Sequence, residues 1–159
     1  MRGINISDFV LDASTTIAWA LNESNRFAVR ARERMAENRA LVPALWWFEL
    51  RNALIVNERR GRVTEQQSAR FLRNVERLPI VVDTVPDESG VLGLARRHRL
   101  TVYDAVYLEL ALRTALPLAT LDATLAAASP PKECPQSATN PTEPVADIAN
   151  ERVDSSLDR

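Results

Sequence analysis

Short apolar runs alternate with longer segments of helical periodicity along the first 128 residues of the chain. The apolar runs predict five short strands, at residues 9–12, 40–42, 80–82, 100–102 and 118–121. The segments between them predict helices at residues 14–21, 25–38, 44–60, 64–78, 87–98 and 104–114. Strands separated by helices pair in parallel and carry helices on both faces of their sheet. The sequence therefore predicts an α/β domain of three layers with a central parallel sheet.

The composition of the chain changes after residue 128. From Ser129 onward the sequence is rich in Pro, Ser, Thr and acidic residues and poor in large apolar ones. Such a segment buries too little surface to offset the entropy of ordering, so we expect one domain at residues 1–128 and a disordered tail at residues 129–159. No stretch approaches the roughly 20 apolar residues of a membrane span, and the N-terminus has no signal-peptide pattern. These features indicate a cytoplasmic protein.

Four acidic residues stand beside apolar runs, where a folded domain seldom places charge. Asp12 and Asp122 each end a predicted strand, whereas Glu49 and Asp104 lie in the first turns of helices that follow strands. Because ligands of parallel sheets collect at the carboxyl ends of the strands, we expect the four carboxylates to converge there. Two carboxylates about 4 Å apart repel by roughly 4 kcal/mol at an effective dielectric of about 20, so the cluster requires protons or a cation.

The residue types available select the class of that cation. The chain has one cysteine, Cys134, and one histidine, His98, which are too few for a zinc site. Carboxylates alone favour hard cations, so we expect Mg²⁺ or Mn²⁺. Ions of this kind activate water and stabilise the developing charge when a phosphodiester is hydrolysed.

Hydroxyl residues accompany the acids and mark helix starts. Ser14 follows Asp12 by two residues and is expected either to cap its helix or to orient a carboxylate or a metal-bound water. Thr120, which stands beside Asp122, is expected either to pack within its strand or to orient a carboxylate or a metal-bound water in the same way. Thr64, followed three residues later by a glutamine, has the spacing of a capping box and opens the helix at residues 64–78.

The formal net charge of −1 conceals an uneven distribution. Residues 129–159 hold three basic and six acidic side chains, which leaves 17 basic and 15 acidic side chains before them. Every basic residue in that earlier part is arginine, whose planar guanidinium pairs with phosphate through two parallel contacts. Genomic base composition also enriches arginine, but such a surface suits a nucleic-acid backbone.

The segments that carry the four acids resemble, in the same order, the signature segments of PIN-domain proteins. The resemblance is greatest to VapC-type toxins of bacterial toxin–antitoxin pairs, and it covers about residues 8–128. The four segments are VLDAS at residues 10–14, PALWWFELRNAL at 43–54, YDAVYLELA at 103–111 and LATLD at 118–122. Family members usually continue through a short helix to a final small strand, whereas this chain passes directly into its Pro-rich tail.

This resemblance implies a fold, an activity and partners. It implies a PIN-like three-layer domain with the activity of a Mg²⁺- or Mn²⁺-dependent endoribonuclease that acts as a toxin on RNA. It implies a homodimer that is silenced by a cognate VapB-type antitoxin. Carried over residue by residue, it makes Asp12, Glu49, Asp104 and Asp122 both the catalytic acids and the metal ligands, with Ser14 as a catalytic accessory.

Other functions remain open at this point. A housekeeping RNA-processing or flap-type PIN nuclease has the same acids, and a degenerate PIN domain binds RNA or an antitoxin without cleaving. A phosphoacceptor receiver domain is disfavoured, because its lysine follows a late strand and the single lysine here, Lys132, lies in the tail. The four glycines form neither a P-loop nor a G-x-G-x-x-G turn, which disfavours nucleotide-binding proteins of those kinds.

Overall fold

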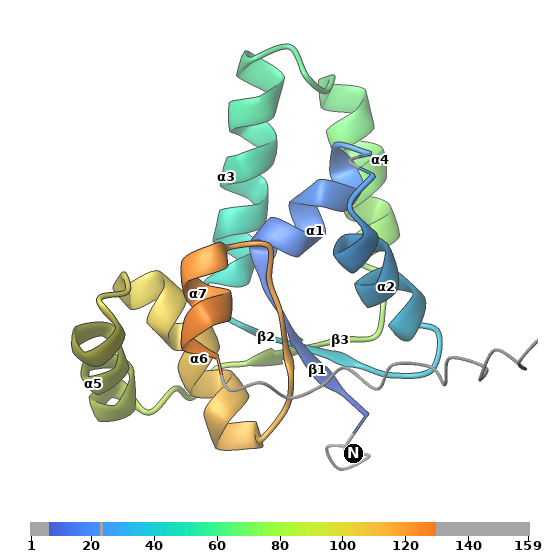
Figure 1. The fold of residues 1–159 in the computed structure, drawn as a ribbon. Coiled ribbons are helices and arrows are strands. Elements are labelled where there is room, and N and C mark those ends of the chain that lie inside the picture. Colours follow the sequence, from blue (N-terminus) through green and yellow to red (C-terminus); the bar gives the residue numbers. More distant parts are fainter. Residues whose placement is uncertain (1–6, 23, 130–159) are drawn as a thin grey trace, which may run out of the picture.

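A computed structural model of the chain describes residues 7–22 and 24–129, which form a parallel sheet flanked by helices (Figure 1). The sheet has four strands in the order β3-β2-β1-β4. Their bounds are β1 Phe9–Leu11, β2 Ala40–Pro43, β3 Ile80–Asp83 and β4 Leu118–Ala119. All three strand pairs are parallel, so the predicted α/β fold with a central parallel sheet is confirmed.

The two central strands are the most buried. β1 and β2 are buried at every position, as continuous apolar runs in a parallel sheet should be. β3 lies at one edge and leaves Val81 and Val82 exposed. The last strand is shorter than predicted, because the chain leaves β4 after Ala119 and Thr120 bonds to a side chain instead.

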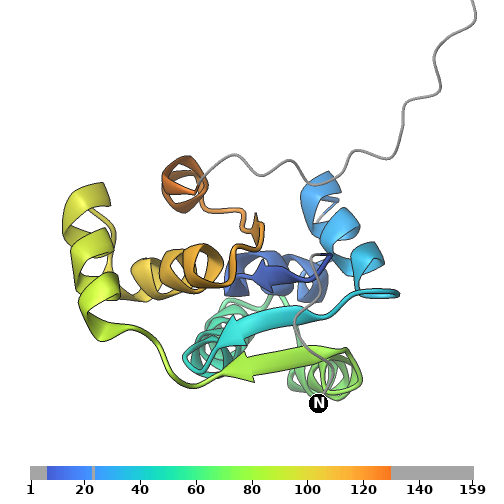
Figure 2. The same ribbon diagram turned by 90° about the horizontal axis from the view of Figure 1, so that it is seen from below.

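Seven helices lie in the described part of the chain. They are α1 Ala13–Ala20, α2 Arg26–Arg34, α3 Trp46–Arg59, α4 Glu65–Val75, α5 Glu88–His98, α6 Val102–Thr114 and α7 Ala123–Ala128. The helices α1 to α4 lie together above the sheet in Figure 1, whereas α5, α6 and α7 gather on its other side. Figure 2 shows α5 outermost, packed against α6 and away from the strands. Right-handed crossovers explain this division, because the chain moves from β1 to β3 in one direction and returns to β4 in the other.

The residues that cap the helices show which of the predicted helix starts are correct. The capping box of α4 is confirmed, with Thr64 and Gln67 bonded to each other's backbone N–H groups. The predicted cap by Ser14 is wrong, because Asp12 is the N-cap of α1 and the Ser14 hydroxyl bonds elsewhere. The predicted strand at residues 100–102 is also wrong, since Thr101 caps α6 and the helix begins at Val102.

The core lies between the sheet and the surrounding helices. Its fully buried members include Phe9, Leu11, Leu50, Tyr107 and Leu108. The helix α6 packs on both central strands, which places its first turn beside the carboxyl ends of β1 and β2.

In the described residues, no helix combines the length and apolarity needed to cross a membrane. The predicted disordered tail at residues 129–159 lies outside the described residues, apart from Ser129.

Candidate active site

The site begins where β1 and β4 end side by side. Leu11 is the partner of Ala119 in the parallel register, and the backbone N–H of Asp12 donates to the Ala119 carbonyl at 3.0 Å. The next residue of each strand therefore leaves the sheet at the same edge. This register brings Thr120 against Asp12, a residue 108 positions earlier in the chain.

Two hydroxyl groups hold one oxygen of Asp12. Ser14 Oγ donates to Asp12 Oδ2 at 2.5 Å, and Thr120 Oγ1 donates to the same oxygen at 2.7 Å. Each hydroxyl oxygen in turn accepts a backbone N–H, from Leu121 and Asp122 respectively, at 3.0 Å. Because those N–H groups occupy the hydroxyl lone pairs, both hydroxyl protons are directed at Asp12. The prediction that Ser14 and Thr120 orient a carboxylate is thus confirmed, and for both residues that carboxylate is Asp12.

The Asp12 carboxylate is costly to ionise in this position. Asp12 is only 7% exposed, and this burial raises the pKa of its carboxyl above the usual value. The hydrogen bonds from Ser14 and Thr120 lower that pKa and offset part of the effect. The group is therefore a buried acid whose charge is supported by hydroxyl dipoles.

Glu49 lies in the first turn of α3, half-buried against α6. The Tyr107 hydroxyl donates to Glu49 Oε2 at 2.5 Å. Burial is the largest cause that raises the pKa of Glu49, and the negative charges of Asp12 and Asp104 raise it further, whereas the Tyr107 bond lowers it. Asp12 and Asp104 are thus close enough for their charges to act on Glu49.

Asp104 lies in the first turn of α6, where Thr101 is the N-cap. The Thr101 hydroxyl donates to Asp104 Oδ2 at 2.6 Å and accepts the Asp104 backbone N–H at 3.1 Å. This reciprocal arrangement fixes the carboxylate at the helix start. The positive end of the helix dipole also favours a negative charge there.

Asp122 stands apart from the other three acids. It is exposed, and its Oδ1 caps α7 by accepting the Leu125 N–H at 2.8 Å. It is linked to Asp12 through Thr120, which accepts the Asp122 N–H and donates to Asp12. The structure therefore groups Asp12, Glu49 and Asp104 and places Asp122 as a helix cap beside the group.

The donor set fits a hard cation held with water. Among the described residues, no group of three or more acidic, histidine or cysteine side chains forms a metal site by itself. Magnesium seldom requires such a group, because it keeps several waters and binds one or two carboxylates together with substrate phosphate. In Asp12, Glu49 and Asp104, side-chain hydroxyls hold one oxygen of each carboxylate. Each of these carboxylates thus has a second oxygen that no side-chain hydroxyl of the described residues holds.

Two residues of this site were not predicted as contributors. Tyr107 and Thr101 each hold one of the acids, and both have a sequence signal. Thr101 precedes Asp104 by three residues, the spacing of a helix-capping pair, and Tyr107 follows it by three, which places both on one helix face. The strand predicted at residues 100–102 obscured the first of these signals.

Three further acids lie near the same elements and pair with arginine. Asp8, which is buried, pairs with Arg39 at 2.7 Å. Asp83 and Glu109 both pair with Arg113, at 2.7 and 2.6 Å. Glu109 is buried, with 4% of its surface exposed, so its charge is compensated by Arg113.

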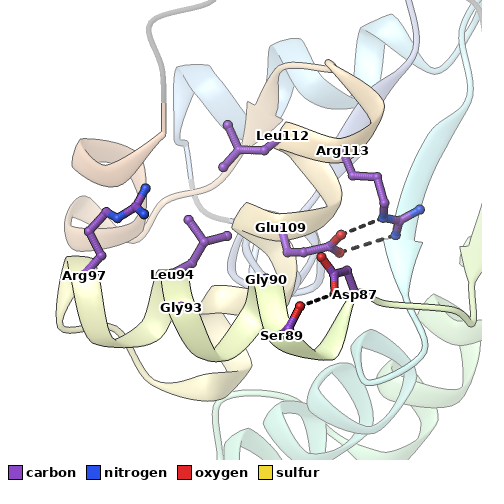
Figure 3. A pocket seen from close by; sticks show the side chains of 9 residues that line it. All are labelled: Asp87, Ser89, Gly90, Gly93, Leu94, Arg97, Glu109, Leu112 and Arg113. Atoms are coloured by element: carbon purple, nitrogen blue, oxygen red, sulfur yellow. Dashed lines mark hydrogen bonds and ion pairs between the residues drawn. The ribbon is translucent and has the colours of Figure 1, made fainter.

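A cavity of about 490 Å³ lies between α5 and α6, where Arg113 and Glu109 form its inner wall (Figure 3). It is also lined by Asp87 and Ser89 from the start of α5, which bond to each other at 2.9 Å. None of the four predicted acids lines it, and its buried carboxylate is already paired with Arg113. The chemistry of the acids is therefore not located in this cavity.

Comparisons with known proteins match the same part of the chain that forms the described fold. Residues 9–129 match the family model described as PIN domain. Among solved structures, the crystal structure of PAE2754 from Pyrobaculum aerophilum is 29% identical, with a TM-score of 0.62 over 80% of this chain and 88% of that chain. No curated protein gives a significant match. The family match ends at Ser129, where the sequence turns into its Pro-rich tail.

Proposed function

The chain belongs to the PIN-domain family, and from this premise we propose that it is a Mg²⁺- or Mn²⁺-dependent endoribonuclease that hydrolyses RNA phosphodiester bonds. PIN domains are generally nucleases. The observation that carries the proposal is the group of Asp12, Glu49 and Asp104 at the carboxyl edge of the sheet, where the charges of Asp12 and Asp104 act on Glu49. No ion pair among the described residues includes any of them.

The acids and hydroxyls have separate roles in this proposal. Asp12, Asp104 and Glu49 would hold the cation, which supplies an activated water and stabilises charge on the phosphate. Ser14, Thr120, Thr101 and Tyr107 hold the carboxylates in place through the bonds described above. Asp122 would act at the rim, where its exposed carboxylate reaches substrate or a second ion.

Asp12→Asn tests the nuclease directly. The asparagine keeps an oxygen that accepts from Ser14 and Thr120, so the fold is retained while the charge that binds the cation is removed. We expect wild-type protein to cleave a single-stranded RNA with Mg²⁺ or Mn²⁺ and not with EDTA. The variant should lose at least about 10²-fold in rate, a loss typical of removing a principal electrostatic group.

The matched control is Glu33→Gln, which removes an exposed carboxylate on α2 outside the group. It should cleave at the wild-type rate. Metal-dependent cleavage by Asp12→Asn at the wild-type rate would contradict the assignment of the site. Tight RNA binding by the wild type without cleavage under any metal would instead support the non-catalytic PIN module.

We further propose that this nuclease acts as the toxin of a toxin–antitoxin pair, in the manner of VapC-type proteins. The four matched segments and their order support this role, and so does the arginine-rich composition before the tail. A homodimer and a VapB-type antitoxin are the partners that the role requires. The alternative of a housekeeping RNA-processing or flap-type nuclease has the same catalytic acids.

Expression in a bacterial host separates these two roles. We expect wild-type protein to arrest growth, Asp12→Asn to have no effect, and co-expression of the adjacent upstream gene to restore growth. Growth without arrest, by a protein that still cleaves RNA in vitro, would favour the housekeeping nuclease.

A further inference from the structure

Tyr107 occupies a position in which a phenylalanine would fill the same space in the core. The residue is 1% exposed and belongs to the main hydrophobic cluster, between α6 and the central strands. Its hydroxyl nevertheless reaches out of that cluster to Glu49 Oε2 at 2.5 Å, across 58 positions of sequence. Buried tyrosine hydroxyls require a partner, but here the partner is a carboxylate of the candidate active site rather than a backbone carbonyl.

The hydroxyl connects the two helices that supply Glu49 and Asp104. Tyr107 lies one turn after Asp104 on α6, and it bonds to Glu49 on α3. The bond therefore ties the first turn of α3, which carries Glu49, to the helix that carries Asp104.

A glutamate side chain has three rotatable bonds, and a half-buried one beside two other carboxylates is repelled by both. A cation that binds such a side chain must offset the rotamer entropy that the side chain loses, so a side chain that is already restricted binds more tightly. The Tyr107 bond supplies that restriction before any cation arrives, because the ring itself is immobilised by the core. It also occupies Oε2, so that one oxygen of Glu49 remains for the cation.

We infer that Tyr107 is a positioning residue of the metal site, which fixes Glu49 by holding Oε2 and reserves Oε1 for the cation bound with Asp12 and Asp104. The inference rests on the proposed function, since it assumes that these acids bind Mg²⁺ or Mn²⁺. It extends that function by assigning a role to a residue that bears no charge and binds no metal.

The test is Tyr107→Phe in the full chain, with Mn²⁺ affinity measured by isothermal titration calorimetry in the absence of RNA. Hydrogen-bond partners of metal ligands typically contribute 10- to 100-fold to metal affinity, so we expect the Mn²⁺ dissociation constant to rise at least about 10-fold. Saturating Mn²⁺ should restore RNA cleavage toward the wild-type rate, because the acids themselves are intact.

Tyr103→Phe is the matched control. It removes the same hydroxyl from the other tyrosine of the chain, which is 65% exposed on the same helix. Its Mn²⁺ affinity should equal that of the wild type. Wild-type affinity in Tyr107→Phe would overturn the inference.

A double-mutant cycle separates positioning from packing. In a Glu49→Ala background there is no carboxylate to hold, so Tyr107→Phe should cause no further loss of Mn²⁺ affinity. An equal loss in both backgrounds would mean that the hydroxyl acts through the core, which overturns the inference.

Glu49→Asp is a second variant in case Tyr107→Phe does not fold. It withdraws the carboxylate from the phenol while leaving the core tyrosine in place, and it should weaken Mn²⁺ binding by a similar factor. Unchanged Mn²⁺ affinity in Glu49→Asp would overturn the inference. Failure of the proposed function has a different signature, because wild-type protein itself would then bind no Mn²⁺ and cleave no RNA.

Discussion

Asp12 and Glu49 occupy surroundings that oppose their charge. Burial raises the pKa of both carboxyls, and the mutual repulsion with Asp104 adds to the effect at Glu49. The arginines of the described ion pairs neutralise other acids, Asp8 through Arg39 and Asp83 and Glu109 through Arg113. The free energy of unfolding of the metal-free protein is therefore reduced by these groups at neutral pH, and a bound cation would relieve the repulsion.

The raised pKa values predict how Glu49 affects stability as the pH changes. A carboxyl whose pKa is higher in the folded than in the unfolded state stabilises the fold below the unfolded value, near 4.5 for Glu, and that contribution is lost as the pH rises through the folded value. Glu49→Gln should therefore raise the free energy of unfolding in EDTA on the order of 1 kcal/mol at pH 8, and by much less at pH 4.

Thermal and urea unfolding between pH 4 and pH 8, followed by circular dichroism, measures this difference. The exposed Glu33→Gln variant is the control and should show no such dependence. A stabilisation by Glu49→Gln that is constant with pH would contradict the prediction. Addition of Mn²⁺ should stabilise the wild type more than the variant.

Helix starts place two of the grouped acids. Glu49 and Asp104 lie in the first turns of α3 and α6, and Asp104 is held by the Thr101 cap. The same cap chemistry occurs on α4, where Thr64 accepts the backbone N–H three residues later at 3.2 Å. The helix that Thr64 caps, α4, carries none of the four acids. Removing each cap in turn therefore distinguishes an effect on helix stability, expected at both, from an effect on the site, expected only at Thr101.

Thr101→Ala and Thr64→Ala should each lower the free energy of unfolding by about 1 kcal/mol, the usual effect of removing an N-cap hydroxyl. Only Thr101→Ala should also weaken Mn²⁺ binding, because only Thr101 donates to an acid of the group. Chemical unfolding and calorimetric titration measure the two effects. Thr101→Ser keeps the hydroxyl and should retain both properties, whereas equal Mn²⁺ affinity in the two alanine variants would refute a role for the Thr101 cap in the site.

The order of the strands brings the residues of the site together from distant parts of the chain. β1 lies between β2 and β4, so Asp12 at the end of β1 has the α3 glutamate on one side and Thr120 on the other. The helix α6 crosses both central strands and brings Asp104 and Tyr107 to the same edge. Every residue of the described core cluster and of the residues packed on it lies between Phe9 and Ala128.

The sequence predicts that residues 129–159 are disordered, so a chain that ends at Ser129 should keep the fold. We expect its free energy of unfolding to stay within about 0.5 kcal/mol of that of the full chain, the usual range for changes outside the core. A chain that ends at Asp122 lacks the fully buried Leu125 of α7 and should be destabilised by at least about 2 kcal/mol. Urea unfolding of the three chains decides between these outcomes, and an equal loss in both truncations would mean that residues beyond Ser129 belong to the domain.

Local signals in the sequence were sufficient for much of this architecture. The alternation of apolar runs and helical segments predicts a parallel sheet with helices on both faces, and the Thr64 capping box predicts the start of α4. Both depend on neighbours within a few residues. The same locality explains the error at residues 100–102, where a short apolar run resembles a strand and the capping residue Thr101 was missed.

The sequence by itself determined the four strands of the sheet, six of the seven described helices, and which acids end a strand or lie in the first turn of a helix. Only the tertiary structure decided that Asp12, Glu49 and Asp104 share one environment while Asp122 caps α7, that Thr120 serves Asp12, and that Tyr107 holds Glu49. The physical reason is range. Helix and strand formation depends on short periodicities and caps, whereas a hydrogen bond across 58 or 108 positions exists only after strand order and register have brought its two partners together.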